Sequence, residues 1–325
     1  MLMRHTMKRA GGGITLGKQA GSETAGVARE FEEKHVVLNG LDINYLEAGR
    51  GEKVLLLIHG GVNNDAFSTW SKFNKTIETL SRYYKVFAPD LPGYGRSDKP
   101  EECTQEYYVN FIKDFVDRII GGKKVNIVGT SMGGGMALGY LLENPGSVES
   151  AVLVAPSCLG FTLDRKSRLG VAVPNGLVSG AVGFLGGHER LTRSLLGVLR
   201  NDRYEAMATR AVRFMDENPM RMAFTEYMRD EAISFGGLLR GKKVGLKTNY
   251  ADRMAGLNGS GVRLLFIEGG EDIFIKKEVI DSVISNVDCA EVVVMDGCGH
   301  SPHFKEPEKF NRLVRSFVEN GTERG

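Results

Sequence analysis

The feature that most constrains this chain is a five-residue segment with glycine at both ends, Gly129–Gly133. Residues 125–128 before it form a short run typical of a buried strand, and residues 132–143 after it have a helical pattern. That helical pattern ends at Asn144-Pro145-Gly146, where proline and glycine stop a helix. A strand followed at once by a helix requires a sharp turn, which flanking glycines tolerate best. The segment therefore predicts that Ser131 lies on a tight turn at the end of a sheet.

The rest of the chain repeats this alternation of strand and helix signals. Strand-like runs lie at 54–58, 85–88, 151–155, 263–267 and 291–295, and helical patterns at 66–81, 107–120, 276–284 and 307–318. Residues 35–46 read as a hairpin closed at Gly40. The alternation predicts an α/β fold, with a mostly parallel sheet flanked by helices.

The alternation stops between about Ser157 and Gly261, where the pattern is helical and contains no convincing strand. We therefore expect a core domain formed by residues 31–156 and 262–325, with residues 157–261 inserted as a helical cap. Within the insertion, the 19 uncharged residues 169–187 approach the length of a membrane span. Pro174 and repeated glycines favour a buried or lid-like segment instead, so we expect no membrane span.

The first 30 residues carry several basic side chains and lack the apolar stretch of a secretory signal. We expect a disordered tail here, with Met7 as a candidate start. The four cysteines are scattered without metal-finger spacing, which indicates free thiols in a reducing compartment. The expected location is the cytoplasm.

Charge and motifs exclude several classes of partner. The 325 residues carry a formal net charge of only +2, which gives no overall field for nucleic acid. The six histidines form no metal-binding pair, and no Gly-Lys-Ser/Thr phosphate loop occurs. We expect a small-molecule substrate and neither a metal nor a nucleotide cofactor, and we leave homo-oligomerisation open.

Ser131 is the candidate nucleophile. A serine hydroxyl is a poor nucleophile near neutral pH and needs a base, most often histidine, to take its proton. His300 lies in a glycine-rich loop after the last strand, at the sheet end where Ser131 is expected, and is the preferred base. His303 is the alternative.

A carboxylate must hold that histidine in the correct tautomer. Asp272 follows the strand at 263–267 and is the preferred acid, with Glu271 and Asp296 as alternatives. Backbone amides must also stabilise a developing oxyanion, typically by ~3 kcal/mol each. The amide of Met132 is one candidate, and the second is the amide of Gly61 or, as an alternative, of Val62.

With these motifs the chain resembles the α/β-hydrolase family over about residues 35–320. The residues that carry the resemblance are His59-Gly60-Gly61, 90–97, 129–133, 269–272, 299–302 and 306–311. The resemblance implies an eight-stranded sheet, a cap inserted after the sixth strand, and hydrolysis without a cofactor. It also supports Ser131, Asp272 and His300 by position and by chain order. A serine at the sharp turn separates the chain from related dehalogenases and epoxide hydrolases, which have aspartate there.

The expected function is hydrolysis of a carboxylic ester of a small, apolar molecule through an acyl intermediate on Ser131. An alternative is C–C bond hydrolysis of a vinylogous keto acid, because residues 70–77 and 90–100 resemble the hydrolases of aromatic ring-cleavage products. Those enzymes usually carry Gly-Pro-Gly after His-Gly and Trp after the catalytic His, where this chain has Val62-Asn63-Asn64 and Ser301. That activity calls for a cationic cap residue, for which Arg190, Arg193 and Arg210 are candidates. A third alternative is a hydrolase-like ligand receptor with negligible turnover.

Overall fold

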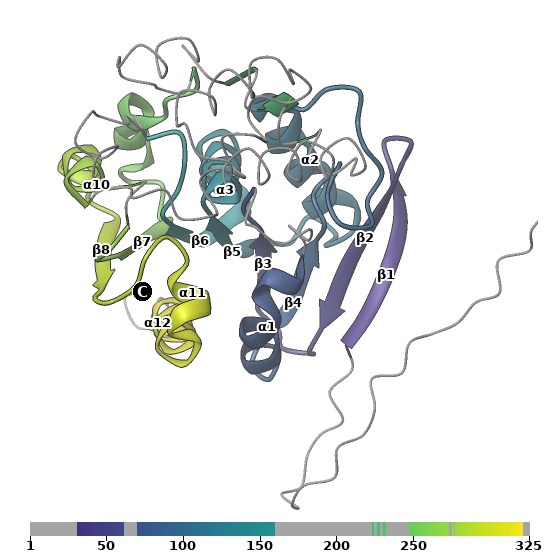
Figure 1. Cartoon of the computed structure of the whole chain (residues 1–325), viewed down its shortest axis with the longest axis horizontal. Helices are drawn as coiled ribbons and strands as arrows, with labels where there is room; N and C mark the ends of the chain where they lie inside the picture. The colour runs from purple at the N-terminus through teal and green to yellow at the C-terminus, as the bar shows by residue number, and fades with distance from the viewer. Residues whose placement is uncertain are drawn as a thin grey trace, which may run out of the picture.

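The computed structural model describes residues 31–61, 70–159, 247–272, 275 and 277–320, together with Ala223, Glu226, Tyr227, Asp230 and Glu231. Its centre is an eight-stranded sheet with strand order β1-β2-β4-β3-β5-β6-β7-β8 (Figure 1). The strands are β1 (Phe31–Leu38), β2 (Leu41–Ala48), β3 (Val54–Ile58), β4 (Lys85–Pro89), β5 (Val125–Thr130), β6 (Val148–Val154), β7 (Arg263–Gly269) and β8 (Ala290–Met295). Only the β1–β2 and β2–β4 pairs are antiparallel. The predicted α/β fold with a mostly parallel sheet is confirmed.

The antiparallel edge begins with the predicted hairpin. Leu38 of β1 pairs with Leu41 of β2, so only Asn39 and Gly40 form the turn. Both turn residues have positive φ, 52° and 82°. A two-residue turn with this geometry matches the right-handed twist of its strands, and Asn-Gly is its preferred sequence.

Helices cover both faces of the sheet. They are α1 (Asn74–Leu80), α2 (Gln105–Arg118), α3 (Met132–Glu143), α10 (Lys277–Ile284), α11 (Pro302–Lys305) and α12 (Pro307–Glu319), with 3-10 helices η1 (Trp70–Phe73), η2 (Pro145–Ser147) and η3 (Ala251–Leu257). Figure 1 shows α1 and α12 on one face and α2 and α3 on the other. The fully apolar strand β3 supplies both cores, since Leu56 faces one hydrophobic cluster and Leu55 and Leu57 face the other.

Two helices begin at other residues than the sequence predicts. The described part of the helix expected at 66–81 is split into η1 and α1. Helix α2 begins two residues earlier than expected because Thr104 caps it, its hydroxyl oxygen accepting a hydrogen bond from the Tyr107 amide at 3.1 Å.

Most of the expected insertion, including the uncharged stretch 169–187, lies outside the described residues. Two described tyrosines within the expected insertion form a buried chain of hydrogen bonds with Gln105 of α2. Tyr227 donates to Gln105 Oε1 at 2.8 Å, and Gln105 Nε2 donates to the Tyr250 hydroxyl at 3.3 Å. None of the helices in the described ranges is long and apolar enough to cross a membrane.

A buried polar pair ties three parallel strands together near their starting ends. Asn126 of β5 donates to the Val54 carbonyl of β3 at 3.2 Å and accepts from the Ser150 hydroxyl of β6 at 2.6 Å. Both side chains are about 99 % buried. A buried donor or acceptor that loses its partner retains its desolvation cost, so this pair contributes to stability.

We predict that a double-mutant cycle on Asn126→Ala and Ser150→Ala gives a coupling free energy of about 0.5–1.5 kcal/mol. The measurement is urea unfolding of the wild type, both single variants and the double variant. Strictly additive losses in stability would contradict the assigned interaction.

Candidate active site

Ser131 occupies the sharp turn that the sequence predicts, between the end of β5 and the start of α3. Its φ of 51° and ψ of −119° are unusual for a residue with a side chain. Three main-chain hydrogen bonds hold this conformation: its amide donates to the Val154 carbonyl at 2.8 Å, and its carbonyl accepts from the amides of Gly135 and Ser157 at 3.0 Å each. The turn therefore presents the side chain of Ser131 at the carboxyl end of the sheet.

The glycines around the turn are required by close packing of the backbone. A Cβ atom on Gly133 would lie 2.2 Å from the carbonyl oxygen of His59, and one on Gly129 would lie 2.5 Å from the carbonyl oxygen of Gly133. Any larger residue at these positions would push β5, α3 and the loop after β3 apart.

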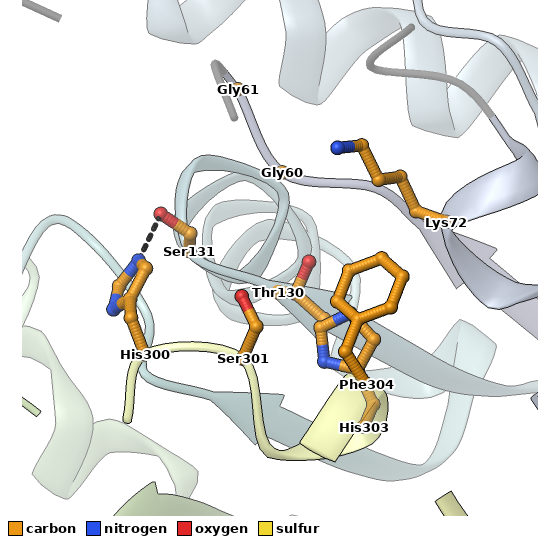
Figure 2. Close-up of a pocket in the computed structure, with 9 residues that line it drawn as sticks. All are labelled: Gly60, Gly61, Lys72, Thr130, Ser131, His300, Ser301, His303 and Phe304. Atoms are coloured by element: carbon orange, nitrogen blue, oxygen red, sulfur yellow. Dashed lines mark hydrogen bonds between the residues drawn. The ribbon is translucent and has the colours of Figure 1, made fainter. Parts of the chain in front are cut away.

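The structure joins Ser131, His300 and Asp272 in a single chain of hydrogen bonds. The Ser131 Oγ lies 2.9 Å from His300 Nε2, as the dashed line in Figure 2 marks, and His300 Nδ1 lies 2.8 Å from Asp272 Oδ2. The side chain of Asp272 is fully buried, and that of His300 is 22 % exposed. The ring of His300 is thus open to solvent beside the serine, while the carboxylate of Asp272 is shielded from water.

The loops that carry Asp272 and His300 are bound to each other. The Glu271 amide donates to the Cys298 carbonyl at 2.8 Å, and the Gly270 amide donates to the Met295 carbonyl at 3.0 Å. A Cβ atom on Gly269 would lie 2.0 Å from the carbonyl oxygen of Gly299, so the two backbones are in direct contact. These contacts set the position of the histidine relative to the carboxylate.

The alternative base and acids are not in this chain of hydrogen bonds. His303 is 95 % buried beside Phe73, Phe304 and Phe310, and burial lowers its pKa to about 3. Glu271 and Asp296 are exposed. Among the candidate bases and acids, all of which are described, only His300 and Asp272 are therefore hydrogen-bonded in series with Ser131.

The ring of His59 has a role that the sequence interpretation missed. Its Nδ1 donates to the Gly60 carbonyl at 2.8 Å, and its Nε2 accepts from the Leu91 amide at 2.9 Å. The ring is fully buried, and burial lowers its pKa to about 4, which keeps it neutral and able to accept this bond. His59 therefore fastens the loop after β3 to the loop after β4.

Asp90 extends the same support to η1. Its carboxylate accepts hydrogen bonds from the Trp70 amide at 2.8 Å, the Asn44 side chain at 2.7 Å and the Arg96 amide at 3.1 Å. Trp70 is the first residue of η1, so this buried carboxylate fixes where that short helix begins. The sequence indicated Asp90 only as part of the motif at 90–97, because its partners Trp70 and Asn44 are distant in sequence.

A pocket opens beside Ser131 (Figure 2). The residues that line it are Gly60, Gly61, Lys72, Thr130, Ser131, His300, Ser301, His303 and Phe304. Gly61 thus lies at the pocket as expected for an oxyanion donor, whereas Val62 is outside the described residues. Met132 starts α3, and its sulfur accepts from the buried Tyr94 hydroxyl at 3.5 Å. Of the two candidate donors, Met132 therefore follows Ser131 directly in the chain, and Gly61 lines the same pocket as Ser131.

A second buried carboxyl group lies close to Asp272 in the chain. Glu268 in β7 is 1 % exposed, and neither of its oxygens has a hydrogen-bond partner within the described ranges. Burial, with a smaller contribution from the charge of Asp272, raises the pKa of Glu268 to about 9. This side chain is therefore protonated and neutral near pH 7.

We predict that Glu268→Gln changes how stability depends on pH. Because the folded pKa of Glu268 is raised from 4.5 to about 9, the wild type loses stability as pH rises through this window. The variant has no such loss. The difference in free energy of unfolding between variant and wild type should therefore shift in favour of the variant by up to about 1.4 kcal/mol for each unit of rising pH. Urea unfolding at pH 5, 7 and 8.5 measures this difference, and a difference independent of pH would contradict it.

Comparison with known proteins agrees with this architecture. A family model described as alpha/beta hydrolase fold matches residues 53–307. Among curated proteins, the chain is 25 % identical over 295 residues to a 2-hydroxy-6-oxo-6-(2'-aminophenyl)hexa-2,4-dienoic acid hydrolase of Metapseudomonas resinovorans. That similarity covers 89 % of this chain and 91 % of the relative.

Solved structures show the same fold. A meta-cleavage product hydrolase from Pseudomonas fluorescens IP01 superposes with a TM-score of 0.63 at 23 % identity, covering 88 % of this chain and 97 % of the other. An esterase from Rhodococcus sp. ECU1013 superposes with a TM-score of 0.60 at 18 % identity, covering 89 % and 98 %. The fold is thus shared by hydrolases of different bonds.

Proposed function

The chain belongs to the α/β-hydrolase fold family and is a hydrolase, and we propose that it cleaves carboxylic esters through an acyl intermediate on Ser131. The observation that carries this proposal is the continuous hydrogen bonding from Ser131 Oγ through His300 to Asp272, at 2.9 and 2.8 Å. This is the geometry that a nucleophile, its base and an orienting acid require.

In the proposed reaction, His300 Nε2 takes the proton of Ser131 as Oγ attacks the ester carbonyl. Asp272 holds the ring with Nδ1 protonated and stabilises the imidazolium that forms. The amides of Met132 and Gly61 stabilise the oxyanion of the tetrahedral intermediate. The C–O bond then breaks, and the leaving alcohol takes the proton from His300.

In the second half of the reaction, the same groups activate a water molecule. His300 removes a proton from a water molecule, whose oxygen attacks the acyl carbon. Collapse of the second tetrahedral intermediate breaks the bond to Ser131 Oγ, and Oγ regains its proton from His300. The carboxylic acid leaves, and the site returns to its starting protonation.

We predict that Ser131→Ala lowers turnover of 4-nitrophenyl hexanoate by at least about a thousandfold, because the nucleophile is lost. The release of 4-nitrophenolate measures the rate, and circular dichroism checks the fold. The matched control is Ser301→Ala, which removes a second hydroxyl from the same pocket and should change the rate by less than about tenfold. Equal turnover by wild type and Ser131→Ala would overturn the proposal.

Asp272→Asn should lower kcat by up to about ten-thousandfold with the fold intact, since an amide at this position favours the wrong tautomer of His300. The paired control is Glu271→Gln, which removes the same charge from the exposed neighbour and should leave kcat near that of the wild type. Single-turnover measurements of acyl-enzyme formation compare the two variants. Similar losses in both would remove Asp272 from its proposed role.

A second candidate function is hydrolysis of a C–C bond in a 2-hydroxy-6-oxo dienoate. The curated relatives favour it, because they include dienoate hydrolases at 25–26 % identity over most of both chains. A direct comparison decides between the two: the loss of absorbance of 2-hydroxy-6-oxo-6-phenylhexa-2,4-dienoate is followed beside 4-nitrophenyl hexanoate hydrolysis. Fast turnover of the dienoate with negligible ester hydrolysis would replace the first proposal by the second.

A further inference from the structure

The first turn of α3, directly after Ser131, has a sequence that forms helix poorly by itself. Met132 is followed by three glycines, 133–135, and glycine is among the weakest helix formers. The same turn holds the nucleophile, because the Gly135 amide donates to the Ser131 carbonyl at 3.0 Å. Contacts that support this turn from outside the helix therefore also support the position of Ser131.

Gln105, the first residue of α2, supplies such a contact. Its buried Nε2 donates to the Gly135 carbonyl at 3.0 Å and to the Tyr250 hydroxyl at 3.3 Å, and its Oε1 accepts from the Tyr227 hydroxyl at 2.8 Å. A carbonyl can only accept, so the amide must turn its nitrogen toward Gly135, and Tyr227 must then be the donor to Oε1. One buried amide thus joins Tyr227 to the helix that begins after the nucleophile.

The second amide that holds the Ser131 carbonyl belongs to the same buried cluster. This amide is that of Ser157, which donates to the carbonyl at 3.0 Å. The next residue, Cys158, has a strained φ of 67°, its carbonyl accepts from the Tyr250 amide at 2.7 Å, and its Sγ lies 3.9 Å from the Tyr227 hydroxyl. Both supports of the Ser131 carbonyl are therefore in contact with the group of residues around Tyr227 and Tyr250.

Tyr227 and Tyr250 belong to the segment 157–261, which the sequence predicts to be an insertion, whereas Gln105 and Gly135 belong to the predicted core. The cation required by the alternative function was expected in the same segment, at Arg190, Arg193 or Arg210. Those three residues lie outside the described ranges. The contacts that are described give the segment a different link to the active site, through a buried hydroxyl group.

We propose that Gln105 and Tyr227 are positioning residues that couple the segment 157–261 to the reactivity of Ser131. Tyr227 fixes the Gln105 amide, Gln105 fixes the Gly135 carbonyl, and the first turn of α3 then holds the backbone of the nucleophile. Neither residue is among the described residues that line the pocket, so both act through the helix. The inference rests on the proposed function for Ser131 as the nucleophile and does not depend on which bond is cleaved.

Phenylmethanesulfonyl fluoride tests the coupling without an ester substrate. Ser131 Oγ displaces fluoride from the sulfur while His300 takes the proton, and intact-mass spectrometry follows the sulfonylated protein over time, with Ser131→Ala as the background. Gln105→Met keeps the size of the side chain and removes its hydrogen bonds, so it should lower the second-order rate constant by about tenfold. Tyr227→Phe should lower it by about threefold to tenfold.

The matched control is Tyr108→Phe, which removes another buried hydroxyl in the same hydrophobic cluster. That hydroxyl donates to the Pro92 carbonyl at 3.0 Å, and the ring centroids of Tyr108 and Tyr227 are 6.1 Å apart. Both tyrosine variants should lose stability in urea unfolding, whereas Tyr108→Phe should change the sulfonylation rate by less than about twofold. Equal losses of rate in the two variants would overturn the inference.

A double variant tests whether Tyr227 acts through Gln105. In a Gln105→Met background, Tyr227→Phe should change the sulfonylation rate by less than about twofold, because the link is already broken. The pH at which the rate reaches half its plateau should be the same in every variant, since the bond between His300 and Asp272 is not part of this chain. Effects that multiply, or a shifted midpoint, would overturn the coupling through Gln105.

The outcomes separate this inference from the proposed function. Sulfonylation of Ser131 without ester turnover would contradict ester hydrolysis, and the rates of the variants would still decide the role of Gln105 and Tyr227. Ester turnover that depends on Ser131, with equal sulfonylation rates in all variants, would overturn the inference and leave the proposed function standing. A wild type that neither phenylmethanesulfonyl fluoride nor diisopropyl fluorophosphate labels at Ser131 would contradict both.

Discussion

The strained backbone at Ser131 is the constraint on which the rest of the site depends. A positive φ at a residue with a side chain costs of order 1–3 kcal/mol, and it persists only where the surroundings leave no alternative. Here β5 fixes one side of the turn, α3 begins at the next residue, and the carbonyl of His59 leaves no room for a side chain on Gly133. The cost of the turn is thus offset by the packing of the sheet, and the serine hydroxyl is positioned by the fold as a whole.

Buried groups that remain neutral support this arrangement. His59 accepts the Leu91 amide only while its Nε2 is unprotonated, and its lowered pKa of about 4 keeps it so. Glu268 is neutral for the opposite reason, because burial raises the pKa of an acid. The side chain of Asp272 is also fully buried, and it is hydrogen-bonded to His300 Nδ1.

The sequence allowed prediction of the elements whose signals are local. Each of Ser131, Asp272 and His300 follows a predicted strand, and the carboxyl ends of parallel strands meet at one edge, so their proximity could be inferred without coordinates. The hairpin turn at Asn39 and Gly40 had an equally local signal. The roles of His59 and Asp90 could not be inferred, because their partners come from other loops and their effects depend on burial. The expected cap lies mostly outside the described residues and stays a prediction.

The bonding between the loops after β7 and β8 has a consequence for how the site tolerates change. Because Glu271 is bonded to Cys298, and Gly269 contacts Gly299, a shift of one loop carries the other with it. The distance between His300 and Asp272 is then insensitive to distortion, whereas the distance between His300 and Ser131 spans two separately held parts of the backbone. Distortion of this site would therefore change mainly the hydrogen bond between His300 and Ser131. Substitutions in the outer loops would alter the distance from His300 to Ser131 before they altered the orientation of the His300 ring.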